Sequence, residues 1–157
     1  MKTLYGILFT FILSTQLHAS HIQGGTIYWD YVSGTTYDIY FVLHAPQTPI
    51  SLPTTVNMNV SGSSLVNSIV LCNQGDLYAG HNCFGGSYIV IVRHFKATVD
   101  LGPMSLNGID LTLELGSRYI VTSNMNLPSA ESVFINAKML PKAGLNISSS
   151  SPRFYTP

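Results

Sequence analysis

Charged residues are scarce in this sequence. Only 9% of its 157 residues are Asp, Glu, Lys or Arg, the formal net charge is zero, and no basic run or acidic tail interrupts the chain. Nucleic-acid binding needs a basic surface, so nucleic acid is excluded as an expected partner. Patterns typical of helices are also lacking, whereas β-branched and aromatic residues are common, and this composition favours strands.

Long hydrophobic runs are missing as well, and a transmembrane helix would need roughly 20 apolar residues. The longest apolar run covers residues 4–13, behind the positive charge of Lys2 and ahead of a more polar stretch that ends at Ala19. This three-part plan is typical of a secretory signal peptide. We therefore predict that residues 1–19 are cleaved after Ala19 and that the protein is secreted or held at the extracellular surface.

Cysteine is limited to Cys72 and Cys83. Export implies an oxidising compartment, so the two are predicted to form a disulfide, which would contribute roughly 3 kcal/mol on a chain-entropy basis. The alternative is a metal site that adds His81 and His94. The four residues lack the paired spacing of zinc sites, so the disulfide is favoured and no metal site is predicted.

Two runs of alternating apolar and polar residues surround a short glycine-containing turn and predict a β-hairpin. A three-residue loop, Ser33 to Thr35, would build one wholly apolar face from both strands. Its cross-strand pairs would be Ile27 with Phe41, Trp29 with Ile39 and Tyr31 with Tyr37. The same register places Asp30 opposite Asp38 on the other face. A two-residue loop would avoid this repulsion but would mix apolar and polar residues on each face, so the first register is preferred. Gly24-Gly25 is predicted to be a flexible entry or a bulge before this hairpin.

Short strands separated by turn signals continue along the chain. They are predicted at residues 56–60, 65–72, 87–95, 101–106, 109–115, 118–123 and 133–140, with a loop at residues 73–86 and the most apolar, central strand at residues 87–95. About eight strands predict an all-β domain over residues 20–140, an antiparallel β-sandwich of immunoglobulin-like type. A jelly roll or a partly open barrel is the alternative. Residues 141–157 carry three prolines and four consecutive serines, and are predicted to be a linker or an edge segment.

Three stretches carry a resemblance to a known family. They read Ser-His-Ile-Gln-Gly-Gly-Thr-Ile-Tyr at residues 20–28, Gly-Ser-Tyr-Ile-Val-Ile-Val-Arg at 86–93 and Ser-Ser-Pro-Arg-Phe at 150–154. The chain resembles the N-terminal β-domain of gliding-motility-associated or adhesin-like surface proteins of Bacteroidota, which open with Ser-His-Ile-x-Gly-Gly. The resemblance implies a cell-surface location, with other β-domains, cell-surface proteins or glycans as partners. The family's further cysteines are absent, so its disulfide pattern is not carried over.

The hairpin supplies the candidate binding residues. Tyr28 and Tyr40 share the outward face with Asp30 and Asp38, and exposed aromatic rings can stack on a sugar or on a partner protein. The aspartate pair could hold a cation such as Ca²⁺, but six or more oxygen ligands are needed and the local sequence offers few, so no cofactor is predicted.

Enzyme signatures such as Gly-x-Ser-x-Gly are absent from the sequence. A catalytic site needs a nucleophile with a base in reach, or a carboxylate pair in a pocket. We therefore predict a non-catalytic, secreted or cell-surface module with a structural or adhesive role. The alternative is a carbohydrate-binding module that uses its exposed aromatic residues.

Overall fold

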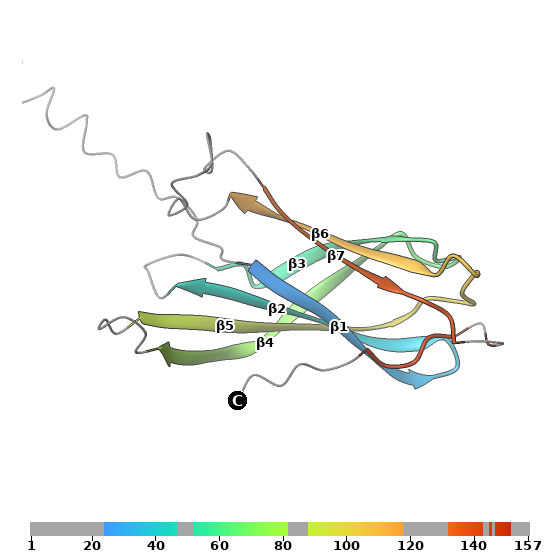
Figure 1. Ribbon diagram of the computed structural model, residues 1–157, viewed down its shortest axis with the longest axis horizontal. Helices are drawn as coiled ribbons and strands as arrows, with labels where there is room; N and C mark the ends of the chain where they lie inside the picture. The colour runs from blue at the N-terminus through green and yellow to red at the C-terminus, as the bar shows by residue number, and fades with distance from the viewer. Residues whose placement is uncertain are drawn as a thin grey trace, which may run out of the picture.

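The computed structural model describes residues 24–46, 52–81, 88–117, 132–142, 145 and 147–151. These residues form seven strands and no helix (Figure 1). The strands are β1 (Gly24–Ser33), β2 (Thr36–Pro46), β3 (Thr55–Ser61), β4 (Ser68–His81), β5 (Tyr88–Asp100), β6 (Ile109–Ser117) and β7 (Ser132–Met139). In this part of the chain, no helical segment could serve as a membrane span. The predicted signal peptide and the predicted strand at residues 118–123 lie outside the described residues.

The seven strands belong to one antiparallel sheet in the order β1-β2-β5-β4-β3-β6-β7. The sheet curls until its two end strands, β1 and β7, approach each other, so it is nearly closed like a barrel (Figure 1). The all-β, antiparallel prediction is confirmed, and the pairing has the character of the partly open barrel rather than of two separate sheets. The strand predicted at residues 87–95 corresponds to β5, which lies inside the sheet between β2 and β4, although β4 holds the middle position.

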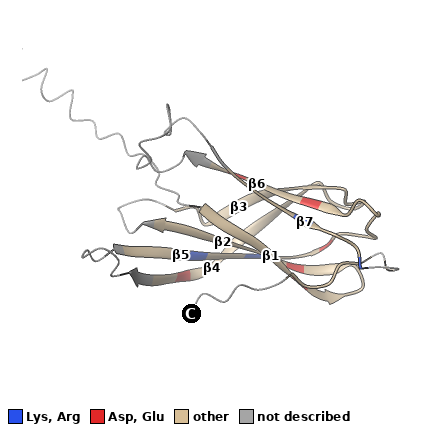
Figure 2. Ribbon diagram, viewed as in Figure 1, with Lys and Arg blue, Asp and Glu red and all other residues tan. Residues whose placement is uncertain are grey.

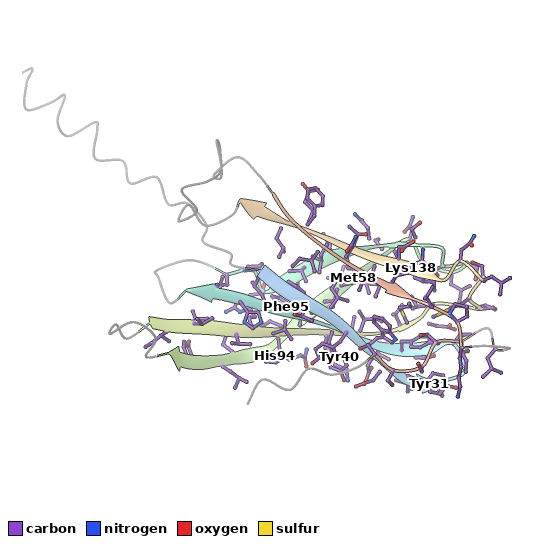
Figure 3. The ribbon with its side chains drawn as sticks, in the orientation of Figure 1. Tyr31, Tyr40, Met58, His94, Phe95 and Lys138 are labelled. Carbon is purple, nitrogen blue, oxygen red and sulfur yellow. The ribbon has the colours of Figure 1, made fainter. Side chains whose placement is uncertain are left out.

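Apolar side chains from every strand fill the inside of the curled sheet. Phe41 and Phe95 face each other across β2 and β5 with ring centroids 5.7 Å apart, and Met58 of β3 belongs to the same core cluster (Figure 3 labels Phe95 and Met58). In β3 burial alternates strictly, because successive side chains of a strand point to opposite faces. The fully buried large side chains are Tyr37, Ile39, Phe41, Leu43, Met58, Leu71, Phe95, Leu101, Ile109, Leu111, Leu113 and Met139.

The register of the first hairpin is as the sequence predicts. Ile27 pairs with Phe41, Trp29 with Ile39, and Tyr31 with Tyr37. The turn differs, because Ser33 pairs with Thr36 and only Gly34 and Thr35 remain as the turn. A bulge between Tyr31 and Ser33 absorbs the extra residue, and Gly34 takes a φ of 55°. The tight turn therefore keeps the apolar face intact while matching the twist of the strands.

The predicted loop at residues 73–86 is wrong as far as His81. β4 continues to His81 and stays paired with β5, apart from one register shift between Asn73 and Gly75. Gly75 has a φ of 132°, and its N–H donates to the side-chain oxygen of Asn73 at 2.8 Å. The Asn and Gly residues that suggest a loop instead build a bulge, after which the ladder resumes.

The predicted strand at residues 101–106 is also wrong, because these residues are irregular. Leu101 and Met104 are buried in the core, while Gly102 takes a φ of 70° and donates its N–H to the Asp100 carboxylate at 3.0 Å. Pro103 has no N–H to give to a ladder. Consequently β6 pairs with β3 and β7, and Asn107-Gly108 does not join two neighbouring strands.

Candidate functional site

The outer face of β1, β2 and β5 carries a row of three side chains. Tyr28 pairs with Tyr40, and Tyr40 pairs with Lys96. The two tyrosine rings are stacked, with centroids 4.6 Å apart and planes inclined by 9°. Lys96 Nζ lies 5.3 Å from the centre of the Tyr40 ring. Because β2 lies between β1 and β5, the Tyr40 ring is flanked by Tyr28 on one side and by an ammonium group on the other.

The aspartate pair lies beside this row. Asp30 is opposite Asp38 in the ladder, as the sequence predicts. Asp38 accepts hydrogen bonds from Lys96 Nζ at 2.8 Å and from the Thr98 hydroxyl, and these bonds, the one from Lys96 above all, lower the pKa of its carboxyl. Lys96 thereby offsets the repulsion between the two carboxylates. Among the described residues, no group of three or more His, Cys, Asp and Glu side chains is placed to hold a metal ion.

An open hollow of about 590 Å³ lies next to the stacked tyrosines. Gly75 contributes no side chain there, and a Cβ built on it would meet nothing within 4 Å. The bulge of β4 therefore leaves space above His94, whose buried Nε2 has no hydrogen-bond partner among the described residues (Figure 3 shows His94 beside Tyr40). The lining residues are Tyr28, Tyr40, Gln74, Gly75, Asp76, Leu77, His94 and Lys96.

Apolar side chains are exposed on the same face of β4. Leu77, at the hollow, is 62% exposed, and Val70, further along the strand, is 56% exposed. Sequence reasoning singles out neither residue for binding, because Leu77 falls in the predicted loop and no outward face is assigned to the strand predicted at residues 65–72. Exposed apolar groups that gather on one face are typical of surfaces that bind other proteins.

An ion pair between β4 and β5 was also missed. Arg93 donates from Nε and Nη2 to the two carboxylate oxygens of Asp76, both at 2.6 Å, and from Nη1 to the backbone oxygens of Leu52 and Pro53 at 2.9 and 2.8 Å. This pairing lowers the pKa of Asp76 and raises the pKa of Arg93. Figure 2 shows the basic segment of β5 beside the acidic segment of β4. Arg93 therefore fixes the connection into β3 against the two strands.

Cys72 is an exposed, free thiol on β4, while its predicted partner, Cys83, lies outside the described residues. The strand runs on from Cys72 for nine residues to His81, a span of about 30 Å at the usual rise per residue. A disulfide needs its two Cα atoms within about 7 Å. The chain has only two residues after His81 in which to return, so the geometry of β4 gives the predicted disulfide no support.

Protein-family models, curated proteins and solved structures were compared with this chain, and none of them matches.

Acid is expected to weaken the fold through its paired carboxylates. The pKa values of Asp38 and Asp76 are lowered in the folded protein, so the stability that they contribute is present above their unfolded pKa, near 4, and is lost as the pH falls through their folded values. We expect Asp76→Asn to be less stable than wild type at pH 7, and this difference to shrink steadily as the pH falls below the unfolded pKa. Urea unfolding of both proteins across this pH range measures it. A difference that stays constant with pH would contradict the expectation.

Proposed function

We propose that this chain is a non-catalytic β-module of a secreted or cell-surface protein, and that it works by adhesion to other proteins through the outer face of β1, β2, β5 and β4. The secreted or cell-surface location is proposed because residues 20–28 resemble the opening motif of the Bacteroidota surface proteins. In an immunoglobulin-like arrangement these four strands would form one layer, and β3, β6 and β7 the other.

The proposal rests on the open hollow, which is lined by the exposed Leu77 and by the stacked rings of Tyr28 and Tyr40. Leu77 offers an apolar contact on one side, and the Tyr28–Tyr40 pair offers aromatic surface on the other. The nearby charges are already paired, Lys96 with Asp38 and Arg93 with Asp76. A partner can therefore cover this face without stripping water from an unpaired charge, which suits a protein–protein contact.

The occupied faces of Tyr40 weigh against the carbohydrate alternative. A sugar ring stacks on the flat face of an aromatic ring, and both faces of Tyr40 are covered, by Tyr28 and by Lys96. The phenol hydroxyl of Tyr40 also points back to Asp38, at 3.5 Å. Stacking removes one face of each ring from contact with a ligand, so the pair offers a pyranose less flat aromatic surface than two separate rings would.

Beads coated with the protein provide the test. We expect them to be retained on cells of the producing species from which the gene has been deleted, and retention to fall at least fivefold for Leu77→Ser with Val70→Ser. Leu106→Ser is the matched control, because Leu106 is 94% exposed but lies in the turn before β6, away from this face. A glycan array is run in parallel with the wild-type protein and with Tyr28→Ala.

Two results would overturn the adhesive proposal. Equal retention of the wild type, the Leu77→Ser/Val70→Ser variant and the Leu106→Ser control would show that the outer face does not mediate adhesion. Specific binding on the glycan array that disappears with Tyr28→Ala would replace protein adhesion with the carbohydrate alternative.

A further inference from the structure

β1 is an end strand of the sheet, and among the described strands it pairs only with β2. In such a strand the N–H and C=O groups of alternate residues point away from the neighbouring strand and need other partners. In β1 these residues include Trp29 and Tyr31, so the backbone groups of Tyr28 and Asp30 face β2. A free edge of this kind can pair with a strand of another chain.

The sequence of β1 lacks the residues that usually protect an edge. Charged side chains, above all Lys, and Pro are the residues with which proteins prevent edge pairing. β1 reads Gly-Gly-Thr-Ile-Tyr-Trp-Asp-Tyr-Val-Ser and contains no Lys, Arg or Pro. Its aromatic and β-branched residues favour pairing of strands instead. Protection of the edge therefore has to come from another part of the chain.

Residues 147–151 supply this protection, and in Figure 1 the red segment after β7 lies beside β1. The N–H of Ser151 donates to the oxygen of Trp29 at 2.9 Å, and the N–H of Trp29 donates back to the Ser151 hydroxyl at 3.0 Å. The N–H of Tyr31 donates to the Ser150 hydroxyl at 2.9 Å. The Trp29 indole donates to the oxygen of Ser149 at 2.8 Å. The outward backbone groups of β1 are thus occupied from within the chain.

Ser148 anchors the segment. Its N–H donates to the Tyr37 hydroxyl at 2.7 Å, and that hydroxyl donates to the Ser148 oxygen at 3.3 Å. Ser148 is only 4% exposed, whereas Ser149 and Ser150 are exposed. The segment is therefore fixed at one buried point beside β2 as well as along the edge of β1.

We propose that residues 147–151 are an edge guard, a strap that keeps β1 from pairing with strands of other chains. A regular strand in this place would only move the free edge outward, because it would direct its own N–H and C=O groups away from β1. Residues 148–151 are irregular, and two of their contacts to β1 use serine hydroxyls instead of backbone oxygens. The guard therefore ends the hydrogen-bond ladder rather than extending it. This role is separate from adhesion through the outer face.

Hydrogen exchange and self-association of the full chain test the guard. Ser151→Pro removes both the N–H and the hydroxyl that bind Trp29, and Tyr37→Phe removes the hydroxyl that holds Ser148. In the double variant we expect the amides of Trp29 and Tyr31 to exchange about tenfold faster than in wild type, with those of Tyr28 and Asp30 still protected by β2. Light scattering should detect association at about tenfold lower protein concentration.

Ser149→Ala is the matched control, because Ser149 contributes only its backbone oxygen to these contacts, and it should behave as wild type in both measurements. Unchanged exchange of Trp29 and Tyr31 in the double variant would show that the segment does not hold the edge. Faster exchange without stronger association would show that the edge needs no guard. If Tyr28 and Asp30 also lose protection, the pairing of β1 with β2 has been lost, and Ser151→Pro alone decides by the same two criteria.

Discussion

Replacing Arg93 with alanine is expected to lower the free energy of unfolding by about 3 kcal/mol. The guanidinium makes four hydrogen bonds, two to Asp76 and two to the backbone oxygens of Leu52 and Pro53. The side chains of Arg93 and Asp76 are only 14% and 20% exposed. Alanine would leave a largely buried carboxylate and two carbonyls without these donors, and it would release the connection into β3.

Urea unfolding of three variants separates these contributions. Arg93→Lys keeps the charge but cannot bind both carboxylate oxygens and both carbonyls with one planar group, so it should recover less than half of the loss. Asp76→Ala combined with Arg93→Ala should cost less than the sum of the single changes, since the two residues share one network. Strict additivity, or a loss below about 1 kcal/mol for Arg93→Ala, would contradict the assigned role.

Alanine at Gly25 is expected to be equally damaging, at about 3 kcal/mol. Gly25 pairs with Leu43 inside the β1–β2 ladder. A Cβ on Gly25 would collide with the ring of Phe41 and lie 2.5 Å from the backbone oxygen of Val42. The predicted flexible entry is therefore wrong at this position, because the glycine permits a close approach between ordered strands.

Thermal or urea unfolding compares this variant with two others. Thr26→Ala is the control within the same strand, since Thr26 is exposed, and it should change stability by no more than about 0.5 kcal/mol. Phe41→Leu, combined with Gly25→Ala, should recover part of the loss because the ring contact is relieved, while the contact with the Val42 oxygen remains. If Gly25→Ala were as stable as wild type, the close approach would be refuted.

Much of the first hairpin can be predicted from the sequence because its information is local. Alternation of apolar residues from Ile27 to Tyr31 and from Tyr37 to Leu43, with a short turn between, allows one register that gathers the apolar side chains on one face. The same register brings Tyr28 to Tyr40 and Asp30 to Asp38. The local pattern does not reveal the role of Lys96, which lies on β5. Lys96 forms the ion pair with Asp38 and places its ammonium group over the Tyr40 ring.

Glycine and asparagine show why local signals also mislead. At residues 73–75 they resemble the end of a strand, yet β4 runs on to His81. Its hydrogen bonds to β5 resume after a single bulge, and these bonds outweigh the cost of the bulge. At residues 101–106 the apolar residues resemble a strand, yet no neighbouring strand accepts them, and Leu101 and Met104 simply fill the core. A strand exists only where a partner completes its hydrogen bonds, and that partner is distant in the sequence.

The sequence by itself therefore determined an all-β protein, the position of most strands, the first hairpin and its two faces, because each depends on neighbours within a few residues. The tertiary structure alone decided the closure of one curled sheet, the Arg93–Asp76 pair, the hollow over Gly75 and the binding of residues 147–151 to β1. These features join residues from 17 to 122 positions apart. Which of the many possible distant pairs form is fixed only when the whole sheet closes around its core.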